Sequence, residues 1–109
     1  MRGDIVSIAS KDAEFTSKPR PAVIIQTDLY SDHRTITVVP ITGVIIKDAA
    51  MIRLDIFPDE KNGLQKHSQI QIDKISTLKR NNVGKAFGRV DHKTMIEIER
   101  LISVFIGLG

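Results

Sequence analysis

The pattern of apolar and polar positions divides the chain into a series of short strands and one closing helix. Short β-branched and aliphatic runs, each bounded by polar or turn-forming residues, predict strands. These runs cover residues 5–8, 21–26, 35–39, 51–56, 68–75 and 84–90. The run at 22–25 is apolar throughout, which predicts a strand buried on both faces, whereas 51–56 and 68–75 alternate as half-buried strands do. Long polar loops are expected at 9–19 and 57–67.

Alternation also assigns faces within residues 68–75. Ile70 and Ile72 are expected to point inward, toward the core. The polar side chains of the same segment are expected on the opposite face, and they are Gln69, Gln71 and Asp73. This segment therefore presents a row of polar groups outside the core.

Proline sets the expected end of the strand at 35–39. Pro40 cannot donate a hydrogen bond to a central ladder, so the strand is expected to stop there. Thr42 and Gly43 then lie just past a strand end. Residues 76–80 are expected to form a short turn or helix.

The last segment predicts a helix, because apolar residues recur at spacings of three and four after a capping Asp91. The apolar stripe consists of Met95, Ile98, Leu101, Ile102 and Phe105. It is expected to pack against the strands, with a partner surface as the alternative, and Gly107 and Gly109 end the helix. The predicted fold class is mainly β with added helices (α+β): a strongly bent antiparallel sheet or barrel with one long C-terminal helix.

Composition narrows the class of protein. The 109 residues suit a single domain spanning 1–109, with 41% hydrophobic and 27% charged residues, as in ordinary globular proteins. Cysteine is absent, which excludes disulfides and thiolate zinc sites, and three scattered histidines do not suggest a metal site. Because we find no cleavable signal and no long apolar run, we expect a cytoplasmic protein. No cofactor is expected.

The charge is concentrated before the helix. The chain carries 16 cations and 13 anions; from Asp91 onward there are 2 and 3, which leaves 14 cations against 10 anions in residues 1–90. A positive field of this kind favours polyanionic partners, such as nucleic acid or an acidic peptide.

Arg20 is the most constrained of these cations, because it stands between Pro19 and Pro21. Each proline ring fixes its own φ and pushes the preceding residue toward extended conformations. Arg20 is thus aimed by the backbone at the entrance of the apolar strand. The alternative is an ordinary turn with a solvated cation.

An ordered set of motifs resembles the MazF/PemK toxins of bacterial toxin–antitoxin systems. The set comprises Arg2-Gly3-Asp4, Lys18-Pro19-Arg20-Pro21-Ala22-Val23-Ile24-Ile25, Val39-Pro40-Ile41-Thr42, residues 68–75 and the closing helix. The resemblance implies an SH3-like β-barrel that forms a homodimer. It also implies a metal-independent endoribonuclease that cleaves single-stranded RNA until a cognate antitoxin with an acidic tail occupies the site.

RNA cleavage without a metal uses the substrate's own 2′-hydroxyl as nucleophile and needs a base, a fixed cation and a proton donor. Arg20 is the expected stabiliser of the phosphorane, because its planar fork can hold two phosphate oxygens. Thr42 matches the family's threonine, although it could equally close a turn before Gly43. The resemblance gives two candidate bases. They are Glu14, in the first long loop, and Asp73, which aligns with an aspartate that one branch of the MazF/PemK family uses as its base. Asp73 could instead bridge to Lys74 or Arg53.

Further residues are expected to contact RNA. They are Lys18, Gln71, His67, Lys66 and Phe15, with Lys11, Lys61 and Arg34 as additional loop cations. Such cations give salt-sensitive phosphate contacts rather than sequence selection. His67 and His33 are also candidates for acid–base work. Tyr30 and Phe15 are the two aromatic residues expected near the groove, and Phe15 could instead anchor the loop in the barrel.

Two other functions remain open at this stage. A gyrase-binding toxin family shares the same barrel and acts through the tip of its C-terminal helix. A small barrel could also bind RNA without cutting it. RNA cleavage compared with gyrase inhibition separates the first two functions, and binding without turnover identifies the third.

Overall fold

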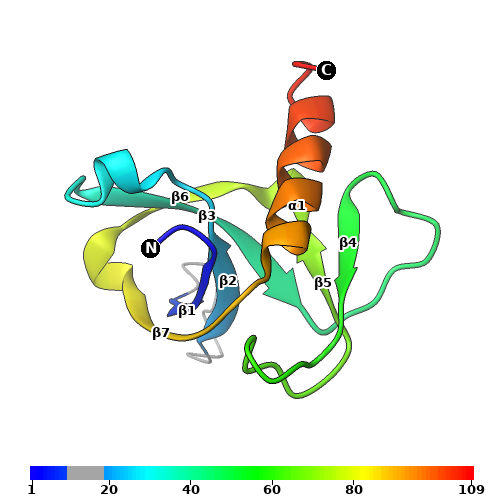
Figure 1. Cartoon of the computed structure of the whole chain (residues 1–109), viewed down its shortest axis with the longest axis horizontal. Helices are drawn as coiled ribbons and strands as arrows, with labels where there is room; N and C mark the ends of the chain where they lie inside the picture. Colours follow the sequence, from blue (N-terminus) through cyan, green and yellow to red (C-terminus); the bar gives the residue numbers. More distant parts are fainter. Residues whose placement is uncertain (10–18) are drawn as a thin grey trace.

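Hydrogen bonds join seven strands into one bent antiparallel sheet in the computed structural model, which describes residues 1–9 and 19–109 (Figure 1). The strands are β1 (Asp4–Ile8), β2 (Arg20–Ile24), β3 (Thr35–Thr42), β4 (Arg53–Ile56), β5 (Ser68–Gln71), β6 (Ser76–Lys79) and β7 (Val83–Arg89). Three short 3-10 helices, η1 (Asp28–Tyr30), η2 (Ile72–Lys74) and η3 (Arg80–Asn82), precede α1 (His92–Phe105). The expectations for Lys11, Glu14, Phe15 and Lys18 lie outside the described residues.

The sheet bends around β3. One edge of β3 pairs with β2, and the other edge pairs first with β6 and then with β5, so the order is β4-β5-β3-β2-β1-β7 with β6 beside the first half of β3. At the far end β1 pairs with β7. Because η3 joins β6 directly to β7, the sheet curls back on itself. The expected bent antiparallel sheet is confirmed.

Two hydrophobic cores lie on opposite faces of this sheet. The inner core is formed by Val6, Ile8, Ala22, Ile24, Ile36 and Val38, inside the curl. The outer core includes Ile5, Val23, Val39, Ile41, Ile70 and Ile72, and lies against α1. Ala22, Val23 and Ile24 thus alternate between the two cores. The prediction of a strand buried on both faces is confirmed.

Helix α1 covers the outer core and crosses in front of β3 in Figure 1. Asp91 caps it, because its side chain accepts a hydrogen bond from the backbone N–H of Thr94 at 2.8 Å. Met95, Ile98 and Leu101 are buried as predicted, whereas Phe105 is exposed because the helix extends past the sheet at that end. No helix of the described chain is long and apolar enough to cross a membrane.

The predicted end of the third strand is wrong. β3 continues through Pro40 to Thr42. Pro40 lies where the partner on one edge changes, since β6 pairs with residues 35–38 and β5 with Ile41 and Thr42. The missing donor of proline therefore costs the ladder little at this position.

The predictions for residues 68–80 also need correction. β5 ends at Gln71 and η2 follows, so Asp73 is not on a strand, and residues 76–79 form β6 rather than a turn. The turn at η2 carries the chain from pairing with the end of β3 to pairing with its start. Gln69, expected outside, is buried, and its amide exchanges hydrogen bonds with the N–H and C=O of Ile46.

Candidate active site

An open cleft of about 760 Å³ lies at the Arg20 end of β2. Its walls come from four parts of the chain that are distant in sequence. They are residues 19–21 at the start of β2, Ile41 and Gly43 at the end of β3, residues 63–66 with Ser68 before and at the start of β5, and Phe87 of β7. The fold thus brings one predicted cation, Arg20, and another, Lys66, into the same hollow.

Arg20 is the first residue of β2 and is exposed. Its backbone pairs in register with Ile8 of β1, and Pro21 pairs with Ser7, so the arginine leaves the sheet at a fixed point. None of the ion pairs among the described residues involves Arg20. A guanidinium placed in this way can offer several donors to an anion in the cleft.

The loop before β5, which supplies residues 63–66 of the cleft lining, is held by a buried amide. Asn62 is 1% exposed. Its Oδ1 accepts from the N–H groups of Asp59 and Leu64, and its Nδ2 donates to the carbonyl of Phe57 at 2.9 Å. These bonds fold residues 57–64 onto themselves. Most of residues 57–67 are exposed, as a polar loop predicts, and the hydrogen bonds of Asn62 give this loop a defined shape beside the cleft.

Thr42 lies at the edge of this cleft, between the lining residues Ile41 and Gly43. Its side chain is buried, and its hydroxyl oxygen accepts a hydrogen bond from the N–H of Val44 at 3.1 Å. This is the turn-closing arrangement considered above. An oxygen that accepts one hydrogen bond still carries its own hydrogen, so Thr42 keeps a donor.

His67 lies outside the cleft, although its neighbours Lys66 and Ser68 line it. Its Nε2 lies 2.8 Å from Oδ1 of Asp55, and its ring stacks on Phe57 with 4.3 Å between ring centroids. The hydrogen bond with His67, together with one from Gln69, lowers the pKa of Asp55. This pair links β4 to the start of β5.

Asp73 and Gln71 also lie outside the residues that line the cleft. Gln71 pairs in register with Arg53 on β4, and Asp73 sits in η2. Oδ1 of Asp73 is buried without a hydrogen-bond partner among the described residues, and no ion pair joins it to Lys74 or Arg53 there. One chain alone thus does not bring Asp73 to Arg20.

Among the described residues, the aromatic side chain that lines the cleft belongs to Phe87 and not to Tyr30. Tyr30 lies in η1, and its ring meets the ring of His33 in an edge-to-face arrangement. It is not among the residues lining the cleft. Phe87 lines it instead and is 45% exposed. Its place follows from the contact of residues 62–63 with β7, which no local pattern reveals.

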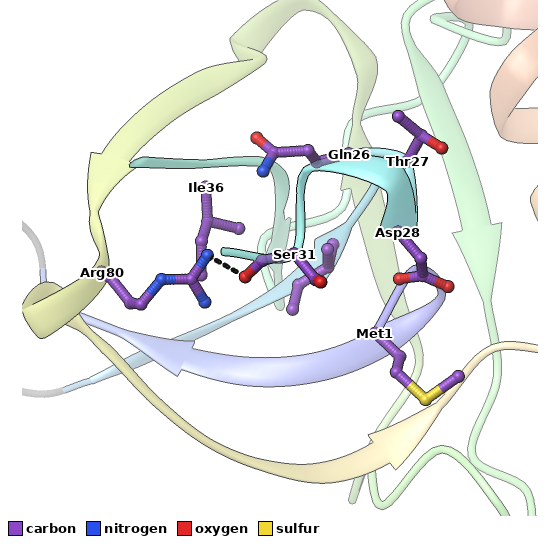
Figure 2. A pocket seen from close by; sticks show the side chains of 8 residues that line it. Met1, Gln26, Thr27, Asp28, Ser31, Ile36 and Arg80 are labelled. Atoms are coloured by element: carbon purple, nitrogen blue, oxygen red, sulfur yellow. Dashed lines mark hydrogen bonds between the residues drawn. The ribbon is translucent and has the colours of Figure 1, made fainter. Parts of the chain in front are cut away.

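A second, smaller pocket of about 110 Å³ lies between the start of the chain, η1 and Arg80 (Figure 2). Arg80 donates hydrogen bonds there to the backbone carbonyls of Ser31 and His33. Of the predicted catalytic residues that the structure describes, Arg20, Thr42 and Asp73, none lines this pocket. Its contacts fasten the segment after β2 to η3, which is a structural role.

The bent sheet, its covering helix and the cationic cleft define a small β protein with a site suited to a phosphate anion. The chain belongs to the family of PemK-like, MazF-like toxins of type II toxin–antitoxin systems, which matches residues 1–106. The resemblance drawn from the motifs is thereby confirmed.

Individual relatives agree with this assignment. The chain is 37% identical over 108 residues to a probable endoribonuclease MazF of Mycolicibacterium smegmatis, covering 99% of this chain and 97% of the relative. It is 33% identical over 90 residues to the endoribonuclease MazF of Staphylococcus saprophyticus, covering 82% and 74%.

Solved structures share the fold. One is a mycobacterial endoribonuclease in complex with its cognate antitoxin, with a TM-score of 0.78 and 20% identity, covering 100% of this chain and 96% of that one. Another is the toxin MazF-mt6 of Mycobacterium tuberculosis, with a TM-score of 0.77 and 23% identity, covering 96% and 98%.

Proposed function

We propose that this toxin is an endoribonuclease that cuts single-stranded RNA, with Arg20 as the residue that stabilises the reacting phosphate. The observation that carries the proposal is the position of Arg20, exposed in an open cleft at a fixed point of the sheet. The proposal is also supported by two relatives that are named as endoribonucleases and that match most of the chain. An enzyme that acts on messenger RNA works in the cytoplasm, and we place this protein there.

The reaction proposed needs no external nucleophile. The 2′-oxygen attacks the neighbouring phosphorus, the bond from phosphorus to the 5′-oxygen breaks, and the products are a 2′,3′-cyclic phosphate and a 5′-hydroxyl. One proton leaves the 2′-hydroxyl and one reaches the departing oxygen. Arg20 stabilises the negative charge that builds up on the phosphorane oxygens, and Thr42 donates its hydroxyl hydrogen to one of them.

We propose Glu14 or Asp73 as the base. Glu14 is close to Arg20 in sequence. Asp73, with Gln71 and His67, lies outside the cleft of its own chain, so these residues reach RNA only along an extended path or from a second subunit. Lys18 and Phe15 are proposed to contact RNA from the first loop.

We also propose a homodimer that a cognate antitoxin inhibits. The support for a dimer is a run of exposed apolar side chains at Val44, Ile45 and Ile46, with Met51 nearby in sequence. Such exposed apolar surface typically marks an interface. The support for an antitoxin is the family, together with the complex solved for a relative of the same fold. An acidic segment would compete with RNA for the cations of the cleft.

The test is cleavage of a mixed-sequence RNA in EDTA, with end analysis of the products. We expect a 2′,3′-cyclic phosphate, loss of cutting when the nucleotide 5′ of the cut is 2′-deoxy, and loss of activity in Arg20→Ala. Arg100→Ala is the matched control, because Arg100 lies on α1 and pairs with Glu97. Cutting that survives the 2′-deoxy change or Arg20→Ala contradicts the mechanism, and gyrase inhibition without cutting points to the alternative toxin.

A further inference from the structure

Lys66 lies directly over the backbone of Gly43, at the point where β3 ends. A Cβ built on Gly43 would overlap the Lys66 side chain and lie 2.6 Å from its Nζ, closer than any such contact in real proteins. A methyl group at residue 43 would therefore displace the flexible end of the Lys66 side chain from this position. The contact joins two segments that are 23 residues apart in sequence.

The charges of the cleft favour an anion. Arg20 and Lys66 line it from different walls, and the described residues that line it include no aspartate or glutamate. None of the ion pairs among the described residues involves Lys66. Two cations that face one hollow without a carboxylate make a binding site for more than one negative charge.

We infer that Lys66 is a second phosphate-binding residue, which holds an RNA backbone phosphate beside the one held by Arg20. Gly43 is its seat, by which we mean that the absence of a side chain at residue 43 leaves the space that the Lys66 ammonium group occupies. This inference rests on the proposed function. RNA carries one charge per nucleotide, so a strand that places one phosphate at Arg20 brings further phosphates along the cleft. An ammonium is a compact point charge, suited to a phosphate that does not react, whereas the fork of Arg20 suits the reacting one.

A contact with a phosphate that does not react is equal in the ground state and the transition state. It should therefore raise affinity and lower KM without changing kcat. The absence of a side chain at Gly43 adds to this effect, because it leaves room for the Lys66 ammonium group at the end of β3. Loss of the seat should resemble loss of the cation, even though the lysine is retained.

The experiment measures binding of a fluorescent 12-nucleotide, mixed-sequence 2′-fluoro RNA between 50 and 200 mM KCl, since this strand lacks the attacking hydroxyl. Lys66→Gln should weaken binding several-fold at 50 mM and reduce the slope of log K against log[salt] by about 0.7, the value for one phosphate contact on a single strand. Gly43→Ala should lose a similar part of the slope. Lys79→Gln, which removes an exposed lysine from β6, is the control and should keep the full slope.

Urea unfolding and steady-state cleavage complete the test. Lys66→Gln should unfold at the wild-type urea concentration and show a raised KM with kcat within about twofold of wild type. A wild-type salt slope in Lys66→Gln overturns the inference, and a wild-type slope in Gly43→Ala alone overturns the role of the seat. Both outcomes leave cleavage by the wild-type protein intact, whereas failure of the proposed function would appear as a wild-type protein that cuts no RNA.

Discussion

Gly88 of β7 lies directly against the backbone of Asn62, in the loop that forms a wall of the Arg20 cleft. A Cβ at position 88 would overlap the Asn62 carbonyl group and lie 3.0 Å from its Cα. The next residue reinforces the contact, because the N–H of Arg89 donates to the carbonyl of Lys61 at 2.9 Å. The shape of the cleft therefore depends on a strand that is more than 60 residues from Arg20 in sequence.

Gly88→Ala is expected to destabilise the protein by about 1 to 3 kcal/mol, because backbone rather than a flexible side chain must move to admit the methyl group. Gly84→Ala, in the same strand, meets Ser7 only at ordinary contact distance and should change stability by no more than about 0.5 kcal/mol. Urea unfolding measures both. Equal midpoints for the two variants would contradict the close packing of the loop on β7.

Asn62→Ala is expected to cost about 1 to 3 kcal/mol, because it leaves the Phe57 carbonyl and the Asp59 and Leu64 N–H groups without their partner. Asn81→Ala, an exposed position in η3, should be nearly neutral. Cleavage should fall more in Asn62→Ala than the loss of folded protein explains, since residues 63–66 line the cleft. A variant with wild-type activity and stability would show that the amide does not organise this wall.

The elements that sequence predicts well are those fixed by local rules. The continuous apolar run at residues 22–25 required a strand with two buried faces, and the three-four spacing after Asp91 required the helix. Arg20 belongs with them, because the two prolines that restrain it are its neighbours. Its position at the entrance of β2 could be stated before the fold was known.

The rest depends on contacts between distant segments. Residues 76–79 form a strand only because the first half of β3 lacks another partner on that edge, and the buried amide of Gln69 is hydrogen-bonded to the backbone of Ile46 in a distant segment. Likewise, Phe87 faces the cleft because the 57–67 loop packs on β7. Periodicity reports which residues share a face, and it does not report what will cover that face.

The pair of Asp55 and His67 predicts a pH dependence of stability. The hydrogen bonds from His67 and Gln69 lower the pKa of Asp55 in the folded protein. Its ionised form therefore stabilises the fold above the ordinary value of 3.8, and this contribution is lost as the pH falls through the lowered pKa. Because the pair is exposed, the effect should stay below about 1 kcal/mol.

Asp55→Asn is the variant that tests this dependence. Its unfolding free energy should lie below that of the wild type at pH 6, and the difference should shrink as the pH falls below 3.8 and through the lowered pKa of Asp55. Asp32→Asn, at an exposed loop position, is the control and should show no such gap. A difference between Asp55→Asn and wild type that persists or grows on acidification would show that the carboxylate charge is not what stabilises the pair.

A comparison of two isoleucines on α1 distinguishes the contribution of core packing to stability from that of helix propensity. Ile98 is fully buried against the sheet, whereas Ile96 is 50% exposed on the other side of the helix. Ile98→Ala should cost about 2 to 5 kcal/mol through lost burial and the cavity it leaves. Ile96→Ala should change stability by no more than about 0.5 kcal/mol, and similar urea midpoints for the two would mean that α1 does not cover the outer core.

The cap of α1 gives the last prediction. The side chain of Asp91 accepts a hydrogen bond from Thr94, and this bond lowers the pKa of the carboxyl group. Asp91→Ala should cost about 1 kcal/mol at pH 7, and Asp91→Asn less, because asparagine also caps helices. The ionised cap stabilises the fold above the ordinary pKa of 3.8, so the gap between wild type and Asp91→Asn should close as the pH falls through the lowered pKa.

Urea unfolding followed by circular dichroism at pH 7 and pH 3 measures that gap. Lys85→Ala, which removes an exposed lysine of β7 rather than one near the cap, should leave the pH dependence unchanged. An Asp91→Ala protein as stable as wild type at pH 7 would show that the cap is dispensable. The gap between wild type and Asp91→Asn should close because a protonated acid no longer interacts favourably with the N-terminal end of the helix dipole. A gap that widens toward pH 3 would show that the negative charge of Asp91 does not stabilise the helix.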